Sequence, residues 1–170
     1  MSFRVPQLPW RALGAVVVVA ALAGGCDDSS SPTAPTTAAA IPPGLTAVLE
    51  QALHDEYLAE TIYQGVIADF GQVLPFVNIL TAEERHSASI ARLYTARALA
   101  PPANPYTVAT VTHYPTITAA CAAGVAAERA NIALYDALLT GDLPADVRQV
   151  FTNNRAASAD NHLPAFLRCS

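Results

Sequence analysis

From Leu45 onward, apolar residues recur every three or four positions, which is the period of a helix with one buried face. No stretch alternates apolar and polar residues in the way that predicts a strand. Glycines and prolines interrupt the period and divide it into four predicted helices. Their inward faces comprise Leu45, Leu49, Ala52, Glu56, Ala59, Tyr63, Val66 and Phe70 in the first, Phe76, Ile79, Glu83, His86, Ile90 and Leu93 in the second, Cys121, Val125, Glu128, Ile132, Tyr135 and Leu139 in the third, and Phe151, Ser158, His162, Phe166 and Cys169 in the fourth.

The predicted connections between these helices are short, long and short. Gly71 ends the first helix and Pro75 opens the second, whereas Ala100–Thr118 contains four prolines and no apolar period. The third helix is predicted from Ala119 to Thr140. A bundle of four helices with one long crossover between the second and third is the ferritin-like arrangement. An up-and-down bundle with short loops throughout is the alternative, and the length of the crossover argues against it.

The first 25 residues have the character of a secretion signal. Ala12–Ala23 is an apolar or small-residue run, shorter than the ~20 residues that span a bilayer. Cys26 follows two glycines, and this junction resembles the lipobox of bacterial lipoproteins, in which the cysteine is lipid-modified and becomes the mature N-terminus. The resemblance implies a protein exported and anchored by lipid to a membrane of the bacterial envelope, facing the periplasm or the cell surface. A plain secreted protein cut nearby is the alternative.

Residues 26–43 are rich in Ser, Thr, Pro and Ala and are predicted to form a flexible tether. Residues 44–170 then form the helical domain. The formal net charge is −5 and the chain contains no lysine. An acidic chain with scattered arginines lacks the basic patch of a nucleic-acid-binding protein.

Carboxylates and imidazoles interrupt the apolar face of every predicted helix. Glu83 and His86 lie one turn apart on the second helix, so both can reach one ion. Burying such groups without a cation is costly, and this pattern is how helix bundles hold one or two metal ions. A solvated polar face, or carboxylates buried beside arginine, is the alternative. The predicted ligands of an iron or manganese centre are Glu56, Glu83, His86, Glu128 and His162.

An internal repeat indicates a gap in this ligand set. Tyr63 and Tyr135 each follow a candidate glutamate by seven residues, and Glu83-x-x-His86 aligns with Ala159-x-x-His162. Ala159 therefore stands where the repeat predicts a sixth ligand. The two tyrosines are candidates for hydrogen bonding to a ligand or for relaying an electron, with simple core packing as the alternative.

Two acidic residues are candidate replacements for the missing ligand. Asp160 points away from His162 on a regular helix, and it reaches the centre only if Pro164 disturbs the helix. Glu60 lies one turn from Glu56 and is otherwise an exposed residue. His54 and His113 are predicted to be surface residues.

The cysteines provide a check on the helix arrangement. Cys121 precedes Glu128 by seven residues and Cys169 follows His162 by seven. If the third and fourth helices are antiparallel, both cysteines lie at the same end of the bundle. We therefore predict a disulfide between them, as expected for an exported protein; two unpaired buried thiols are the alternative.

Several short motifs resemble the ferritin-like superfamily of di-iron and di-manganese proteins, and most closely a prokaryotic family of unknown function related to rubrerythrins. The motifs are Asp55-Glu56-Tyr57, Tyr63, Phe70-Gly71, Pro75-Phe76-x-x-Ile79, Ala82-Glu83-x-x-His86, Glu128 with Tyr135, and His162-Leu-Pro-Ala-Phe166.

The resemblance implies a redox enzyme that reduces dioxygen or peroxide, or oxidises Fe²⁺. Glu83 and Glu128 would bridge two ions, Glu56 would be a terminal carboxylate, and His86 and His162 would be terminal nitrogen ligands. The chain has no four-cysteine electron-transfer module, so an enzyme would need an external electron donor. A non-catalytic metal carrier or storage protein and a metal-free helical scaffold are the alternatives. A homodimer is a candidate oligomeric state.

Overall fold

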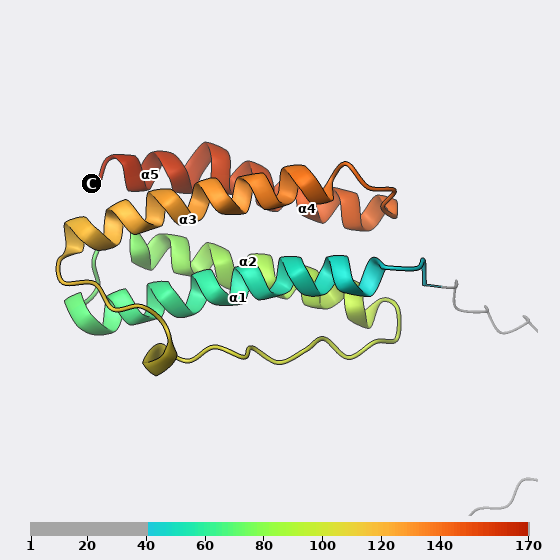
Figure 1. Ribbon diagram of the computed structural model, residues 1–170, viewed down its shortest axis with the longest axis horizontal. Helices are drawn as coiled ribbons and strands as arrows, with labels where there is room; N and C mark the ends of the chain where they lie inside the picture. The colour runs from blue at the N-terminus through green and yellow to red at the C-terminus, as the bar shows by residue number, and fades with distance from the viewer. Residues whose placement is uncertain (1–40, 170) are drawn as a thin grey trace, which may run out of the picture. The chain divides into compact units, whose positions relative to one another are not determined.

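The computed structural model describes residues 41–169, and this part of the chain is helical with no strand. The predicted all-α class is therefore confirmed. The signal segment, Cys26 and all but the last residues of the tether lie outside the described residues. No helix in the described range is long and apolar enough to cross a membrane. The helices are α1 (Leu45–Phe70), α2 (Phe76–Thr95), α3 (Ile117–Leu138), α4 (Ala145–Ala157) and α5 (Leu163–Leu167), with a π turn, η2 (Ser158–His162), between the last two (Figure 1).

The helices pack in two adjoining pairs. α1 packs most extensively on α2, while α4, η2 and α5 form one continuous rod beside α3 (Figure 1). α1 also contacts α3, and α2 contacts α4. The long connection between α2 and α3 runs along α1, and its short 3₁₀ turn η1 (Val108–Thr110) packs on that helix. The short, long, short order of connections matches the prediction.

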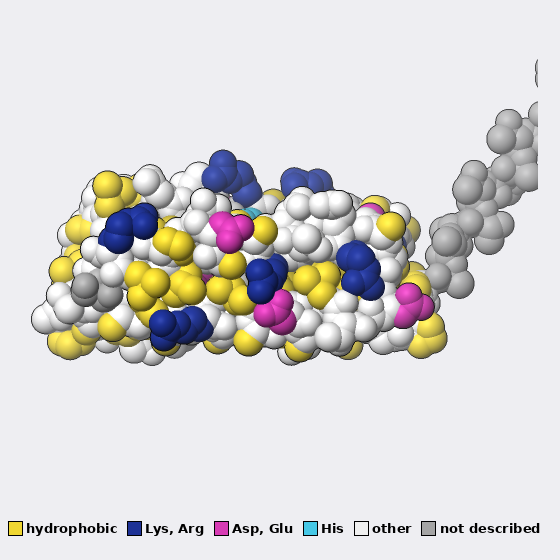
Figure 2. Space-filling model, turned by 90° about the horizontal axis from the view of Figure 1, so that it is seen from above, with side chains coloured by type: hydrophobic (Ala, Val, Ile, Leu, Met, Phe, Trp, Pro, Cys, Tyr) yellow, Lys and Arg dark blue, Asp and Glu magenta, His cyan; other side chains and the backbone are white. Residues whose placement is uncertain are grey.

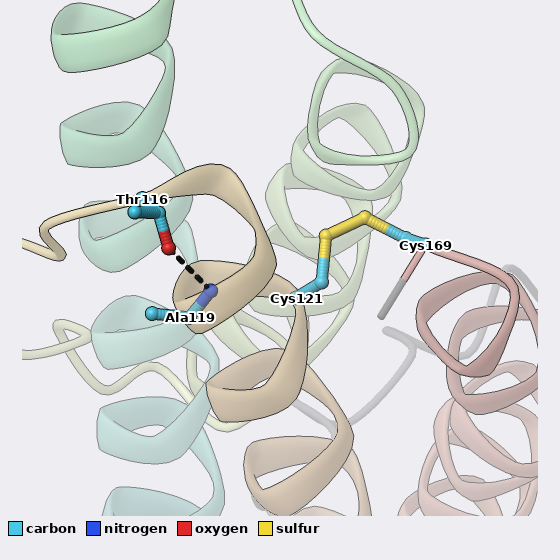
Figure 3. The surroundings of a disulfide bond; sticks show 4 residues. All are labelled: Thr116, Ala119, Cys121 and Cys169. Atoms are coloured by element: carbon cyan, nitrogen blue, oxygen red, sulfur yellow. Dashed lines mark hydrogen bonds between the residues drawn. A yellow bond between two sulfur atoms is a disulfide. The ribbon is translucent and has the colours of Figure 1, made fainter.

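Local chemistry accounts for the ends of the helices. Gly44 and Gly71 flank α1 with φ of +81° and +84°, a backbone region that glycine adopts without a steric penalty. The hydroxyl of Thr116 accepts a hydrogen bond from the backbone N–H of Ala119 and caps α3 (Figure 3). This cap explains why α3 begins at Ile117 rather than at the predicted Ala119.

The fourth predicted helix is not a regular α-helix throughout. Pro164 has no backbone N–H, so it cannot make the α-helical hydrogen bond to the carbonyl of Asp160. The backbone N–H of Leu163 bonds instead to the carbonyl of Ser158, five residues back, which widens the turn into η2. This wider turn changes which side chains of the segment face inward.

Two apolar clusters lie at opposite ends of the bundle and leave a polar layer between them. One contains Leu49, Ile90 and Phe151, and the other contains Tyr63, Phe76 and Phe166. The second cluster lies at the end where Cys121 and Cys169 are joined by the predicted disulfide, with their Cα atoms 5.7 Å apart (Figure 3).

Removing this disulfide should lower the stability of the bundle. The bond closes a loop with a sequence separation of 48, and in the chain-entropy model such a loop contributes about 4 kcal/mol. We expect Cys121→Ser/Cys169→Ser to lower the free energy of unfolding in urea by roughly that amount. The reduced wild type serves as the matched control, since it should resemble the variant; equal stability of oxidised and reduced protein would contradict this role.

Two helix glycines offer a matched test of core packing. A Cβ at Gly124 would lie 2.6 Å from the buried ring of Phe166, whereas a Cβ at Gly65 would meet Val111 at an ordinary 3.5 Å. Overpacking a well-filled core typically costs 1–3 kcal/mol, and alanine otherwise favours a helix over glycine. We expect Gly124→Ala to be less stable than Gly65→Ala by about 1–3 kcal/mol in thermal or urea unfolding. Equal stability of the two variants would show that Phe166 moves aside freely.

Candidate metal centre

The structure brings all five predicted ligands together in the polar layer. α1 contributes Glu56, α2 contributes Glu83 and His86, α3 contributes Glu128 and η2 contributes His162. The three glutamates are at most 2% exposed. Because each helix places its ligand on its buried face at the same level, side chains far apart in the sequence meet in one small volume.

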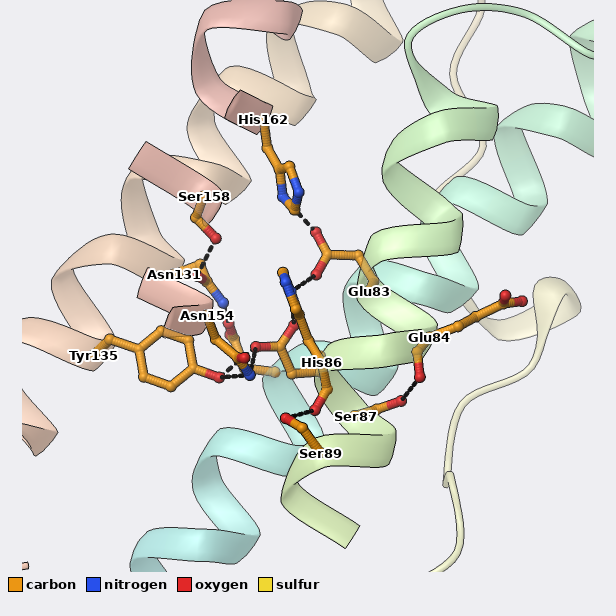
Figure 4. Close-up of polar contacts among 12 residues, drawn as sticks. Glu83, Glu84, His86, Ser87, Ser89, Asn131, Tyr135, Asn154, Ser158 and His162 are labelled. Carbon is orange, nitrogen blue, oxygen red and sulfur yellow. Dashed lines mark hydrogen bonds and ion pairs between the residues drawn. The ribbon is translucent and has the colours of Figure 1, made fainter. Parts of the chain in front are cut away.

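Glu83 is the central residue of this arrangement, because its carboxylate lies between the two imidazoles (Figure 4). Its Oε2 is 2.8 Å from Nδ1 of His86 and its Oε1 is 3.0 Å from Nδ1 of His162. Glu56 Oε2 lies 3.5 Å from His86 Nδ1, and Glu128 Oε2 lies 3.4 Å from His162 Nδ1. The layer thus contains two groups of potential ligands, Glu56/Glu83/His86 and Glu83/Glu128/His162, with Glu83 shared.

This geometry differs in one respect from the expected roles. The family resemblance implies that Glu83 and Glu128 both bridge two ions, but only Glu83 belongs to both groups. Glu128 approaches His162 alone, just as Glu56 approaches His86 alone. Glu56 and Glu128, the two outer glutamates, therefore have equivalent positions. Of the described residues, Glu83 on α2 is the one carboxylate that both groups share.

Each outer glutamate is held by a tyrosine from the opposite helix. The hydroxyl of Tyr63 on α1 donates to Glu128 Oε1 at 2.8 Å, and the hydroxyl of Tyr135 on α3 donates to Glu56 Oε1. The two pairs cross because α1 and α3 are antiparallel and both repeats have the same seven-residue spacing. These bonds occupy one oxygen of each glutamate and leave its Oε2 directed at an imidazole.

Several buried polar atoms of the centre have no hydrogen-bond partner. These include Glu56 Oε2, Glu128 Oε2 and His162 Nδ1. Although His162 Nδ1 lies close to two carboxylate oxygens, the atoms are not aligned as hydrogen-bond donor and acceptor. A buried polar group without a partner costs about 1–3 kcal/mol, and a cation placed among these lone pairs would remove that cost.

The carboxylates and imidazoles shift one another's pKa values. Burial, together with the neighbouring charge of Glu83, raises the pKa of Glu56 to about 8. Burial also raises the pKa of Glu128. Burial alone would raise the pKa of Glu83, but the contacts with His162 and His86 outweigh it and lower that pKa to about 2.

The imidazoles show the complementary effect. Burial disfavours their charged forms, but the adjacent carboxylates outweigh it and raise the pKa of His86 to about 10 and that of His162 to about 9. Without a metal, protons therefore take the place of cations in this layer.

The segment around Ala159, where the repeat predicts a sixth ligand, is a π turn rather than a regular α-helix. In the wider turn of η2, Ser158 and His162 both face inward, whereas Ala159 is half-buried and Asp160 is exposed. The helix is disturbed at Pro164 as the sequence suggested, yet the disturbance does not turn Asp160 towards the centre. Asp160 is therefore wrong as a candidate replacement for the sixth ligand.

A chain of polar side chains occupies the side of the layer where the sixth ligand was expected. Ser158 Oγ donates to Asn131 Oδ1 at 2.8 Å (Figure 4). Asn131 Nδ2 donates in turn to Asp55 Oδ2 at 2.7 Å. Asn154 reaches Glu56 Oε1 at 3.4 Å. Sequence reasoning missed both asparagines, and the available signal was that Asn131 follows Glu128 by three residues on the inward face.

Glu60 is buried rather than exposed, and its Oε1 has no hydrogen-bond partner. It belongs to neither ligand group. His113 is exposed and paired with Asp69 at 2.6 Å, as expected for a surface residue. His54 was also predicted to be a surface residue but is half-buried, because it packs edge-on against Tyr106 with ring centroids 6.4 Å apart; it lies outside the centre.

Two openings lead from solvent to the centre. A cavity of about 140 Å³ between α1 and α3 is lined mainly by apolar residues and reaches Glu83 and Glu128. A wider cleft of about 360 Å³ lies between α2 and the η2–α5 segment, where His86 and His162 line it. The first opening is large enough for a small molecule such as dioxygen or peroxide.

Comparison with known proteins identifies no relative. No protein-family model matches the chain, and no curated protein or solved structure matches it significantly.

Metal binding at this centre should release protons. At pH 7 His86, His162 and Glu56 carry protons, because their pKa values of about 10, 9 and 8 lie above the solution pH. Metal ligation requires the deprotonated groups. We therefore expect affinity for Mn²⁺ to rise between pH 6 and pH 8 by about tenfold per pH unit for each displaced proton. Calorimetric titrations in buffers of different ionisation enthalpy would measure the release, and a pH-independent affinity would contradict these protonation states.

Proposed function

We propose that this protein binds two ions of iron or manganese in the polar layer and uses them for oxidation–reduction chemistry on dioxygen, peroxide or Fe²⁺. The observation that carries the proposal is the position of Glu83, whose two oxygens each face a different imidazole while an outer glutamate completes each group. Each ion would have one imidazole, one outer carboxylate and a share of Glu83. Such a set leaves coordination positions free for a substrate.

The chemistry of the donor set supports iron or manganese. Carboxylates with imidazoles suit these ions, whereas structural zinc sites are rich in thiolate ligands. Cys121 and Cys169 are joined to one another and are not in either ligand group. The unpartnered oxygens of Glu56 and Glu128 add to this support, because they face inward from opposite helices.

The helix arrangement is a second line of support. Four helical rods with one long crossover, each contributing to a central carboxylate and histidine layer, are typical of ferritin-like di-metal proteins. Together with the motif resemblance, this leads us to propose a ferritin-like, rubrerythrin-related bundle. Because a fold does not determine an activity, the activity is inferred from the ligand layer.

The bound ions would supply the electron-transfer chemistry, and the residues of the chain would set its geometry. Tyr63 and Tyr135 hold the outer oxygens of the two terminal glutamates. The cavity between α1 and α3 admits a small oxidant to Glu83 and Glu128. Fe²⁺ oxidation supplies its own electron, whereas reduction of a peroxide to two waters consumes two electrons and two protons and so requires an external donor.

The N-terminal sequence supports a proposal for the location of the protein. We propose that residues 1–25 direct export, that Cys26 carries a lipid, and that the tether holds the helical domain close to an envelope membrane. The disulfide between Cys121 and Cys169 agrees with an oxidising compartment.

Neighbouring glutamates on α2 provide a matched test of the metal centre. Glu83 is buried and shared by both groups, whereas Glu84 is exposed and points away from them (Figure 4). We expect two ions per chain in the wild type and in Glu84→Gln, and a loss of both in Glu83→Gln, measured by elemental analysis after iron or manganese loading. Glu56→Gln and Glu128→Gln should each retain one ion. Equal metal content in Glu83→Gln and Glu84→Gln would refute the centre.

The activity is tested on the same samples. Loaded wild type should catalyse the loss of peroxide in the presence of a reductant, or the oxidation of Fe²⁺, and Glu128→Ala should abolish it. One tightly held ion without turnover would identify a carrier or storage protein instead. Absence of metal from protein purified without chelators, and failure to load it, would identify a metal-free scaffold.

A further inference from the structure

The two imidazoles of the centre line the cleft between α2 and the η2–α5 segment. Their rings are stacked, with centroids 5.4 Å apart and planes inclined by 24°. Nδ1 of each ring faces the carboxylates. The opposite ring edge, which carries Nε2, is therefore directed away from the carboxylates, and the cleft lies on that side of the centre.

Neither Nε2 atom has a hydrogen-bond partner among residues 41–169. This is unusual for a metal site, because a ligating imidazole normally donates its other N–H to a carboxylate, a carbonyl or water. Here the inference rests on the proposed function in one respect: an ion held at Nδ1 fixes the proton on Nε2. The cleft is then lined by two imidazole N–H donors with no acceptor from the described chain.

The polar walls of the cleft supply more donors and no acidic group. Arg85, Asn78 and Asn161 line it together with the two histidines, and no aspartate or glutamate is among its lining residues. Over the face of the bundle shown in Figure 2, arginines are interspersed with acidic side chains. Arg85 makes no ion pair or side-chain hydrogen bond within the described part of the chain. The cleft is therefore suited to an anion.

The remaining lining residues are apolar and come from both sides of the cleft. They are Pro75, Ile79 and Ala82 on the α2 side and Ala157 and Ala165 on the other, and the volume of about 360 Å³ exceeds what a single inorganic ion fills. From this combination of donors and apolar lining we infer that the cleft binds a small organic acid. Its carboxylate meets Arg85 and the imidazole N–H groups, and its carbon chain lies along Ile79 and Ala165.

The test compares two exposed arginines of the same helix. Arg85 lines the cleft, and Arg92 lies two turns further along α2, outside its lining. Calorimetry on the manganese-loaded chain should show hexanoate binding that Arg85→Gln weakens by about tenfold and Arg92→Gln leaves unchanged. Hexanoate should bind more tightly than acetate, by up to about fourfold per methylene. Imidazole N–H resonances of a zinc-loaded sample should shift on addition of hexanoate.

Each contrary result is informative. Equal binding by Arg85→Gln and Arg92→Gln, or unshifted imidazole resonances, would overturn the inference. Tighter binding of inorganic phosphate than of hexanoate would overturn the assignment to an organic acid. Because metal content is measured on the same samples, two bound ions without hexanoate binding would refute the cleft alone. Hexanoate binding that depends on Arg85 in a protein holding no metal would support the cleft and refute the proposed function alone.

Discussion

The structure of this bundle depends on how a buried carboxylate is accommodated between two imidazoles. Glu83 is almost fully buried, and its two oxygens lie 2.8 and 3.0 Å from His86 and His162. A carboxylate in such a position is destabilising unless cationic groups compensate it. Protons or metal ions at the imidazoles can provide this compensation. The contact between Glu83 on α2 and His162 on η2 therefore depends on the charge state of the layer. The apolar clusters on either side lower the local polarity, and this makes an uncompensated charge more costly.

The sequence was sufficient to predict which carboxylates and imidazoles meet in the polar layer, because the helical period determines which residues face inward. Glu56, Glu83, His86, Glu128 and His162 each interrupt an apolar stripe, and all five meet in the structure. The π turn was harder to predict. Pro164 indicated that the helix is disturbed. Which side chains then face inward depends on the carbonyl that accepts from the backbone N–H of Leu163, and this is the carbonyl of Ser158. The role of Asn131 was also hidden, since its partners Ser158 and Asp55 lie on other helices.

The two openings give the centre different kinds of access. The cavity between α1 and α3 is narrow and mainly apolar, and it leads directly to the carboxylates. The cleft on the other side is wider and lined by donors, and it meets the imidazole rings rather than the space between the ligands. The two openings therefore reach different groups of the polar layer, the carboxylates from one side and the imidazoles from the other.

The crossed pairs formed by Tyr63 with Glu128 and by Tyr135 with Glu56 have a consequence for how the chain tolerates change. Because the two hydrogen bonds are separated by two helical turns on antiparallel helices, sliding one helix along the other breaks both at once. The register of α1 and α3 is thus determined at the middle of the bundle and not by the segments that connect them. Insertions and deletions in the long crossover can accumulate without moving a ligand, whereas one residue gained or lost between Glu56 and Tyr63 would dismantle the layer.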